Sequence, residues 1–166
     1  MAAMAIPQVL AGMDRARTVG AARYFAQRCG AARMQAITRS ANVAIRFQPR
    51  DEDYVMQMFV DRNDNGVRIA DIDSGVDTPL TEPASLQRDF PGVRIGIAPD
   101  LPIGSDPVKV GSGGLMSFTP LGTATPGSIF IVGKDGTQFA VRVLGATART
   151  RLERYDARAR RWLPLW

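Results

Sequence analysis

The sequence predicts an α+β fold, with one long N-terminal helix packed on antiparallel β-sheet. From Pro7 to about Arg39 the chain contains no further proline and is rich in good helix formers such as alanine, arginine and glutamine. After Ser40 the apolar side chains recur with a period of two, and no further helix of any length is evident. Parallel crossover units are therefore not expected. The chain divides into a helix at residues 1–40 and a β-rich head at residues 41–166.

The predicted helix carries one apolar stripe, because small and apolar side chains recur at three- and four-residue steps. The members of this stripe are Ala22, Phe25, Cys29, Ala32 and Ala36. A helix of this length spans roughly 50 Å at 1.5 Å per residue. That is longer than a domain of this size is wide, so one end is expected to project from the head or to pack on another chain.

The N-terminal end of the helix is the part that we expect to project. In Met1–Met13 the only polar side chain is Gln8, but the run is shorter than the roughly 20 apolar residues that cross a bilayer. No basic region precedes it, so it does not fit a signal peptide. Two interpretations remain open: a helix start buried in the core, or the second half of a membrane helix whose first half would lie before Met1.

The remainder of the chain is expected to form short strands with β-branched and aromatic residues. Lys134-Asp135-Gly136 and Asn65-Gly66 are typical of hairpin turns, because glycine tolerates a positive φ. Residues 74–92 and 98–114 have the composition of loops. The candidate strands are residues 43–48, 54–60, 67–72, 93–97, 115–118, 128–132, 139–144 and 149–155.

The charges form three blocks within a formal net charge of +5. Residues 14–39 and residues 142–161 each carry a charge of +5, whereas residues 51–82 hold nine acidic residues against two arginines and carry −7. Two basic ends thus flank an acidic middle. Such blocks fit either an ordinary solvated surface or charged partners such as nucleic acid or neighbouring subunits.

The composition argues against an enzyme. The chain has no histidine, which removes the commonest general base and most zinc sites, and its single cysteine, Cys29, excludes an internal disulfide. Residues 111–114 are glycine-rich but lack the following lysine and helix of a phosphate-binding loop. A carboxylate-pair hydrolase using Asp71, Asp73 or Asp77 would rest on their clustering alone. We therefore expect no catalytic residues, no cofactor and no small-molecule substrate.

Several stretches along nearly the whole chain are similar, in order, to segments of one family. Residues 2–8 and 14–17 look like the second half of a type IV pilin N-terminal helix. The other similar segments are residues 31–37, 60–66, 118–122, 127–129 and 149–151. Together they resemble the FimT/GspH group, which comprises minor pseudopilins of type II secretion and minor pilins of type IV pili.

The resemblance implies a pilin-like fold and a structural role. Subunits of this kind are held in the bacterial inner membrane by a single helix, pack helix on helix with other pilins or pseudopilins, and place their heads in the periplasm. Minor subunits are thought to lie at or near the filament tip and to help start assembly. The family's cleavage-site glycine, the following aromatic residue and the glutamate would all lie before Met1. The resemblance therefore implies that the membrane-proximal half of the helix is missing, through trimming or a late start codon.

Near the C-terminus the family's Gly-Arg-x-Arg segment is present as Ala148-Arg149-Thr150-Arg151. Some relatives in type IV pilus systems are believed to bind DNA through it. Guanidinium groups suit phosphates, and the aromatic side chains Tyr155 and Trp162 lie between further arginines. The alternative function is therefore a DNA-binding minor pilin for DNA uptake, and a third is a free-standing periplasmic binding domain. The candidate nucleic-acid-binding residues are Arg149, Arg151, Arg154 and Arg158.

One weak calcium candidate lies in the acidic middle. Asp61, Asn63 and Asn65, followed by Gly66, match the first half of an EF-hand loop, in which oxygens at alternate positions face one ion. The twelfth position is Ile72 instead of glutamate, so the bidentate carboxylate is missing. The ordinary interpretation is a turn, for which Asn-Gly suffices.

Overall fold

The structure of the chain is a computed structural model that describes residues 5–165, with side chains from Leu10 onward. Helix α1 (Ala5–Arg39) is one continuous helix of 35 residues. It ends in a Schellman motif, because Ser40 has a left-handed φ of 50° and the N–H groups of Ser40 and Ala41 bond to the carbonyls of Ile37 and Ala36. This turn leads the chain directly into the first strand.

Within the described residues, the strands form two sheets in which every pairing is antiparallel. The first sheet has the order β3 (Thr78–Pro79), β2 (Asp53–Val60), β1 (Val43–Arg50) and β7 (Leu115–Phe118), with β4 (Ala84–Ser85) also on β2. The second has the order β11 (Arg161–Leu165), β10 (Thr150–Asp156), β9 (Gln138–Val143), β8 (Gly127–Gly133) and β5 (Val93–Ile95), with β6 (Val108–Lys109) also on β8. Three short helical turns lie between strands: α2 (Ile69–Asp73), α3 (Leu86–Asp89) and the 3₁₀ turn η1 (Ser112–Gly114).

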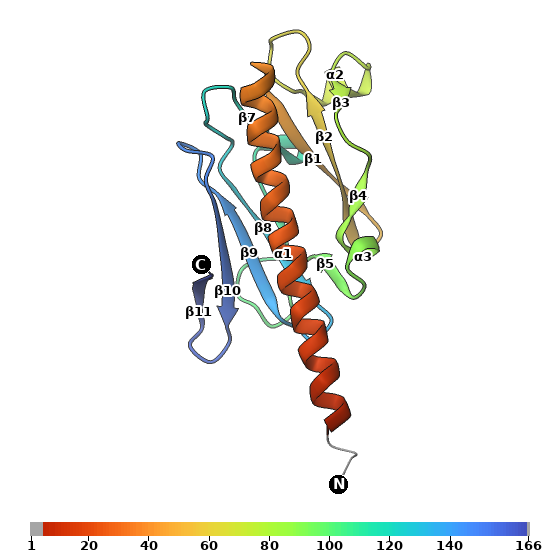
Figure 1. Ribbon diagram of the computed structural model, residues 1–166, viewed down its shortest axis with the longest axis vertical. Coiled ribbons are helices and arrows are strands. Elements are labelled where there is room, and N and C mark those ends of the chain that lie inside the picture. Colours follow the sequence, from red (N-terminus) through yellow and green to blue (C-terminus); the bar gives the residue numbers. More distant parts are fainter. Residues whose placement is uncertain (1–4, 166) are drawn as a thin grey trace.

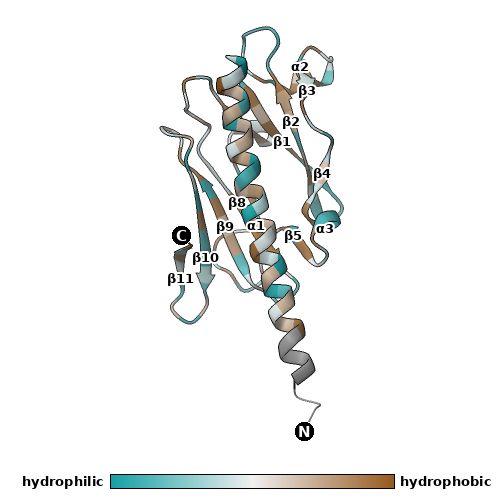
Figure 2. Cartoon of the chain, viewed as in Figure 1, coloured by the Kyte–Doolittle hydropathy of each residue, from teal (hydrophilic) through white to brown (hydrophobic). Residues whose placement is uncertain are grey.

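Helix α1 lies across both sheets, and its N-terminal part extends beyond the head (Figure 1). The predicted stripe is the contact face, since Ala22, Phe25, Cys29, Ala32 and Ala36 are all fully buried. Four of these five side chains are small, which allows the helix axis to lie close to the strands. In Figure 2 the strands β1 and β2 carry brown, apolar residues, while the visible side of α1 is mixed with teal. The predicted α+β, pilin-like architecture is confirmed.

Two local predictions are wrong. Residues 67–72 were expected to form a strand, but Ile69–Asp73 is helical, and Asn65-Gly66 does not close a hairpin because β2 pairs with β3 instead. The reason is a long-range carboxylate. Buried Asp77 accepts the backbone N–H groups of Arg62 and Arg68, which bends the segment away from the sheet. The other hairpin, at residues 134–136 between β8 and β9, is confirmed.

The exposed end of α1 argues against one of the two interpretations of its N-terminal run, and the membrane-helix interpretation stays a prediction. Leu10 and Met13 are 56% and 46% exposed, so this part of the helix is not buried in the core. The side chains of residues 1–9 lie outside the described part of the structure. Among the described residues, no helical stretch reaches the length and hydropathy needed to cross a bilayer.

Packing of the small stripe residues gives a first prediction. Ala32→Leu should lower the free energy of unfolding by about 1–3 kcal/mol, because the larger side chain must displace well-packed neighbours. Ala31→Leu is the matched control, since Ala31 is exposed on the same helical turn and leucine is also a good helix former. Urea unfolding followed by circular dichroism measures both. Equal midpoints for the two variants would contradict the close packing of helix and sheet.

Candidate functional site

The N-terminal part of α1 is the first candidate surface, because it is helical yet uncovered. Apolar Leu10 and Met13 project into solvent here. Further along the same helix, Met34 and Ile37 are also exposed, at 58% and 40%. These two are three residues apart and therefore share one face, away from the buried stripe. Exposed large apolar side chains on one helix are typical of a surface that packs against another chain.

The C-terminal arginines are the second candidate surface, and the structure places them on different faces of the second sheet and in the adjoining turn. Arg149 is exposed just before β10, and Arg151 is exposed on the outer face of the second sheet, with a long ion pair of 4.0 Å to Glu153. Arg154 has the opposite parity on β10, so its side chain lies on the face toward α1. Arg158 lies in the turn between β10 and β11. The four predicted residues therefore do not form one continuous patch.

Ala148 occupies the place of the glycine expected before this arginine segment. Its φ is 49°, a left-handed conformation that glycine adopts without steric cost and alanine does not. The side chain is also buried, at 4% exposure. The backbone geometry suited to glycine is thus kept despite the substitution.

The aromatic residues among the arginines pack on one another. The Trp162 ring lies 5.2 Å from that of Tyr155 and 5.7 Å from that of Phe130, measured between centroids. The guanidinium of Arg142 covers the Trp162 ring at 5.5 Å and forms a 2.7 Å ion pair with Glu153. Trp162 was an aromatic candidate for contact with nucleic acid. In the structure its ring packs against other side chains on the outer face of the second sheet.

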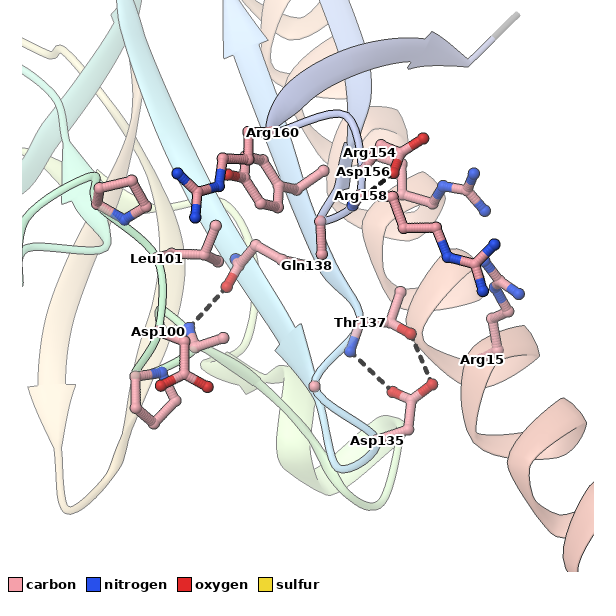
Figure 3. Close-up of a pocket in the computed structure, with 16 residues that line it drawn as sticks. Arg15, Asp100, Leu101, Asp135, Thr137, Gln138, Arg154, Asp156, Arg158 and Arg160 are labelled. Carbon is pink, nitrogen blue, oxygen red and sulfur yellow. Dashed lines mark hydrogen bonds between the residues drawn. The ribbon is translucent and has the colours of Figure 1, made fainter.

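Arg154 and Arg158 line an open cavity of about 1090 Å³ between the head and α1. Arg160 lines it too, and so does Arg15, which comes from the helix. Figure 3 shows Arg15, Arg154 and Arg158 on the side of the cavity toward the helix, with Arg160 opposite, near Leu101. Sequence reasoning missed Arg15, because the only signal for it was the general excess of arginine at both ends of the chain.

Three aspartates line this cavity: Asp100 lies near Leu101 (Figure 3), whereas Asp135 and Asp156 are engaged with their own backbone turns. Asp135 accepts from the N–H and hydroxyl of Thr137 at 3.1 and 2.6 Å. Asp156 accepts from the N–H groups of Arg158 and Ala159 at 2.9 and 3.2 Å. The bond from Ala159 is the main cause that keeps the pKa of Asp156 below its usual value, with the charge of Arg154 adding to it. Both carboxylates therefore serve to shape turns.

The calcium candidate is a hydrogen-bonded loop. One oxygen of Asp61 accepts the N–H of Asn63 at 3.2 Å, and the other accepts the N–H of Gly66 at 2.7 Å and the amide of Asn42 at 3.0 Å. Asn65 donates its side-chain amide to Asp71. The oxygens of Asp61 are thus used to close the loop, and the metal hypothesis remains a prediction. Within residues 5–165, no group of three or more acidic or cysteine side chains is placed to hold a metal ion.

The carboxylates named for a hydrolase are each held by separate partners. Asp77 binds backbone N–H groups of the loop, Asp71 accepts from Asn63 and Asn65, and Asp73 forms a 2.9 Å ion pair with Arg46. Cys29 is fully buried on the face of α1 that packs on the sheets, and this burial raises the pKa of its thiol to about 12, although the charge of Arg28 opposes the rise. Such a thiol is not a nucleophile near neutral pH.

The model of the family described as type II transport protein GspH matches residues 21–147 of the chain. This range begins in the buried part of α1 and includes the strands from β1 to β9, which is more than half of the chain. The chain belongs to the GspH family. A search of curated proteins and a search of solved structures found no match.

Membership of the GspH family indicates a structural role. Members of the family are structural pseudopilins and not enzymes, and they assemble with other pilins or pseudopilins. The chain is accordingly a type II secretion pseudopilin or minor pilin. The strands β10 and β11, which carry Arg151, Arg154 and the adjoining turn, lie outside the matched range.

The Asp61 loop gives a second prediction. Burial alone would raise the pKa of Asp61, but bonds from Asn42, Gly66, Asn63 and Asn65 outweigh it and leave the pKa below its usual value. The loop is therefore most stable above the ordinary aspartate pKa and loses this contribution as the pH falls through the lowered value. At neutral pH, Asp61→Asn should lower the free energy of unfolding by about 1–3 kcal/mol, because an amide nitrogen replaces an accepting oxygen.

Asp64→Asn is the control, since Asp64 is exposed and its left-handed φ of 59° suits asparagine. Chemical unfolding at neutral pH and at a pH below the lowered pKa of Asp61 measures the effect. The difference between the wild type and Asp61→Asn should shrink at the acidic pH. A difference that is independent of pH would show that the charge of Asp61 does not matter.

Proposed function

We propose that the chain is a minor pseudopilin of a type II secretion system that lies at or near the tip of the pseudopilus and helps to start its assembly. Its helix is held in the inner membrane before assembly, and its head faces the periplasm. The observation that carries this proposal is the uncovered N-terminal part of α1, where Leu10 and Met13 are exposed on a helix that runs past the head. A neighbouring pseudopilin helix would bury these side chains.

The tip position is supported by the other end of the molecule. Residues 61–77 contain five aspartates against two arginines. Asp61 and Asp77 are bonded to backbone N–H groups within this segment, so the loop holds its shape by itself. The exposed carboxylates of this end, Asp64 and Asp73, suit contact with solvent better than contact with the next subunit.

Cross-linking in cells tests the helix contact. Leu10→Cys or Met13→Cys should form a disulfide-linked or bismaleimide-linked adduct with matching cysteine variants of a second pseudopilin. The native Cys29 gives no background, because it is buried with a pKa of about 12. Ser74→Cys is the control, since Ser74 is exposed at the head. Adducts that form equally from position 74, or none from positions 10 and 13, would overturn the assignment of this helix surface.

The initiating role has its own test. In cells that produce the other pseudopilins, deletion of this chain should abolish or strongly reduce pseudopilus formation, and the wild-type chain should restore it. Electron microscopy with an antibody against the head should then label filament ends. Labelling along the whole filament would contradict the tip position.

A second candidate function is DNA binding for uptake, through Arg149, Arg151, Arg154 and Arg158. What favours it is the exposure of Arg149 and Arg151, whose guanidinium groups are open to a phosphate backbone. In a low-salt gel shift with a DNA duplex, the double variant R149Q/R151Q should need several-fold more protein than the wild type for half retardation. No retardation of any duplex by the wild type would end this candidate.

A further inference from the structure

Three arginines that line the cavity between α1 and the head form no ion pair among the described residues. Among the described residues, neither Arg15, Arg154 nor Arg158 forms an ion pair with a carboxylate, although Asp100, Asp135 and Asp156 line the same cavity. Asp135 accepts from Thr137, and Asp156 accepts from the turn at residues 158–159. The lining still carries four arginines against these three aspartates, and an anionic ligand would offset this excess of positive charge.

The three guanidinium groups converge from separate elements. Arg15 is on α1, Arg154 is on β10, and Arg158 is in the turn that follows (Figure 3). Arginine presents its donors in a planar fork that matches two oxygens of a phosphate. A site assembled from a helix, a strand and a turn differs from a single charged segment, because it can surround one anion from several sides.

An apolar cavity adjoins the arginines. It has a volume of about 440 Å³, and Arg15 and Arg154 line it as well as the first cavity. Its other walls are Arg23 and a set of apolar or small residues: Gly12, Ala16, Val19, Gly20, Phe139 and Leu165. A ligand that fills both cavities must therefore carry an anionic group next to a hydrocarbon part. A phospholipid has this chemistry, whereas free phosphate and double-stranded DNA do not.

The location of the cavity fits a membrane surface. The turns β8–β9 and β10–β11 lie at the end of the head from which α1 projects (Figure 1). Arg15 follows the exposed Leu10 by about 7.5 Å along the helix, at 1.5 Å per residue. If the apolar start of α1 enters a bilayer, Arg15 and its neighbours face the headgroups. Clusters of arginine at such a position attract anionic lipids.

We propose that Arg15, Arg154 and Arg158 form a binding site for the phosphate of an anionic phospholipid, whose hydrocarbon part enters the adjoining apolar cavity. This inference rests on the proposed membrane-held state of the subunit. The bound lipid would fix the head against the membrane surface before the subunit joins the filament. On extraction into the filament, the lipid would have to leave this site.

Vesicle flotation with the purified chain tests the site. The probes are vesicles of phosphatidylcholine alone and of phosphatidylcholine mixed with phosphatidylglycerol. Binding to the mixed vesicles should exceed binding to the neutral ones, and R154Q/R158Q should weaken it by about tenfold. The matched control is R149Q/R151Q, which removes the same charge from the same part of the chain outside the cavity and should weaken binding by less than about twofold. R15Q is a third variant, and it should resemble R154Q/R158Q although it alters only the helix.

The remaining outcomes overturn the proposal. Equal losses in the two double variants, with unchanged circular dichroism, would show that general surface charge binds the vesicles. Displacement by millimolar inorganic phosphate would identify a free-anion site, and tighter binding of a DNA duplex that depends on Arg154 and Arg158 would identify a nucleic-acid site. Flotation uses the purified chain, so its result is independent of the cross-linking from Leu10. Loss of the cross-links together with intact lipid binding would overturn only the filament role.

Discussion

The close contact of α1 with both sheets is the constraint on which the head depends. The two sheets share no strand pairing among the described residues, and the buried face of the helix lies against both. Ala22, Ala32 and Ala36 allow this approach, while Phe25 fills the space that the small side chains leave. Phe25 packs against Phe47 of β1 with ring centroids 5.8 Å apart. The helix that would lie in a filament is therefore also the central core element of the head.

Part of this fold could be predicted from the sequence. The helix and its stripe followed from residue spacing, and the hairpin at residues 134–136 followed from a local turn signal. The segment at residues 67–72 could not be predicted, because Asp77 holds its backbone from outside the segment. Strand β11 was also missed: its Pro164 weakens a strand signal, and an edge position makes that proline tolerable.

The candidate site was predicted only in part, for a geometric reason. Successive side chains of a strand point to opposite faces of the sheet. Arg151 and Arg154 are close in sequence but three residues apart, so they lie on opposite faces of β10. Conversely, Arg15 and Arg154 lie far apart in the sequence and line the same two cavities. The charge blocks at the two ends of the chain indicated attraction to a charged partner but did not indicate that the blocks meet. Only the packing of α1 on the second sheet brings them together.

The burial of Cys29 determines when its thiol can react. Its sulfur lies 3.9 Å from that of Met116 beneath the helix, where neither oxidants nor disulfide exchange catalysts can reach it while the helix stays in place. An odd cysteine that is exposed can pair with the thiols of other chains. Here the risk is confined to the interval before α1 docks on the sheets. Folding itself therefore acts as the protection of this thiol, and exposure of Cys29 to a thiol reagent reports directly on misfolded subunits.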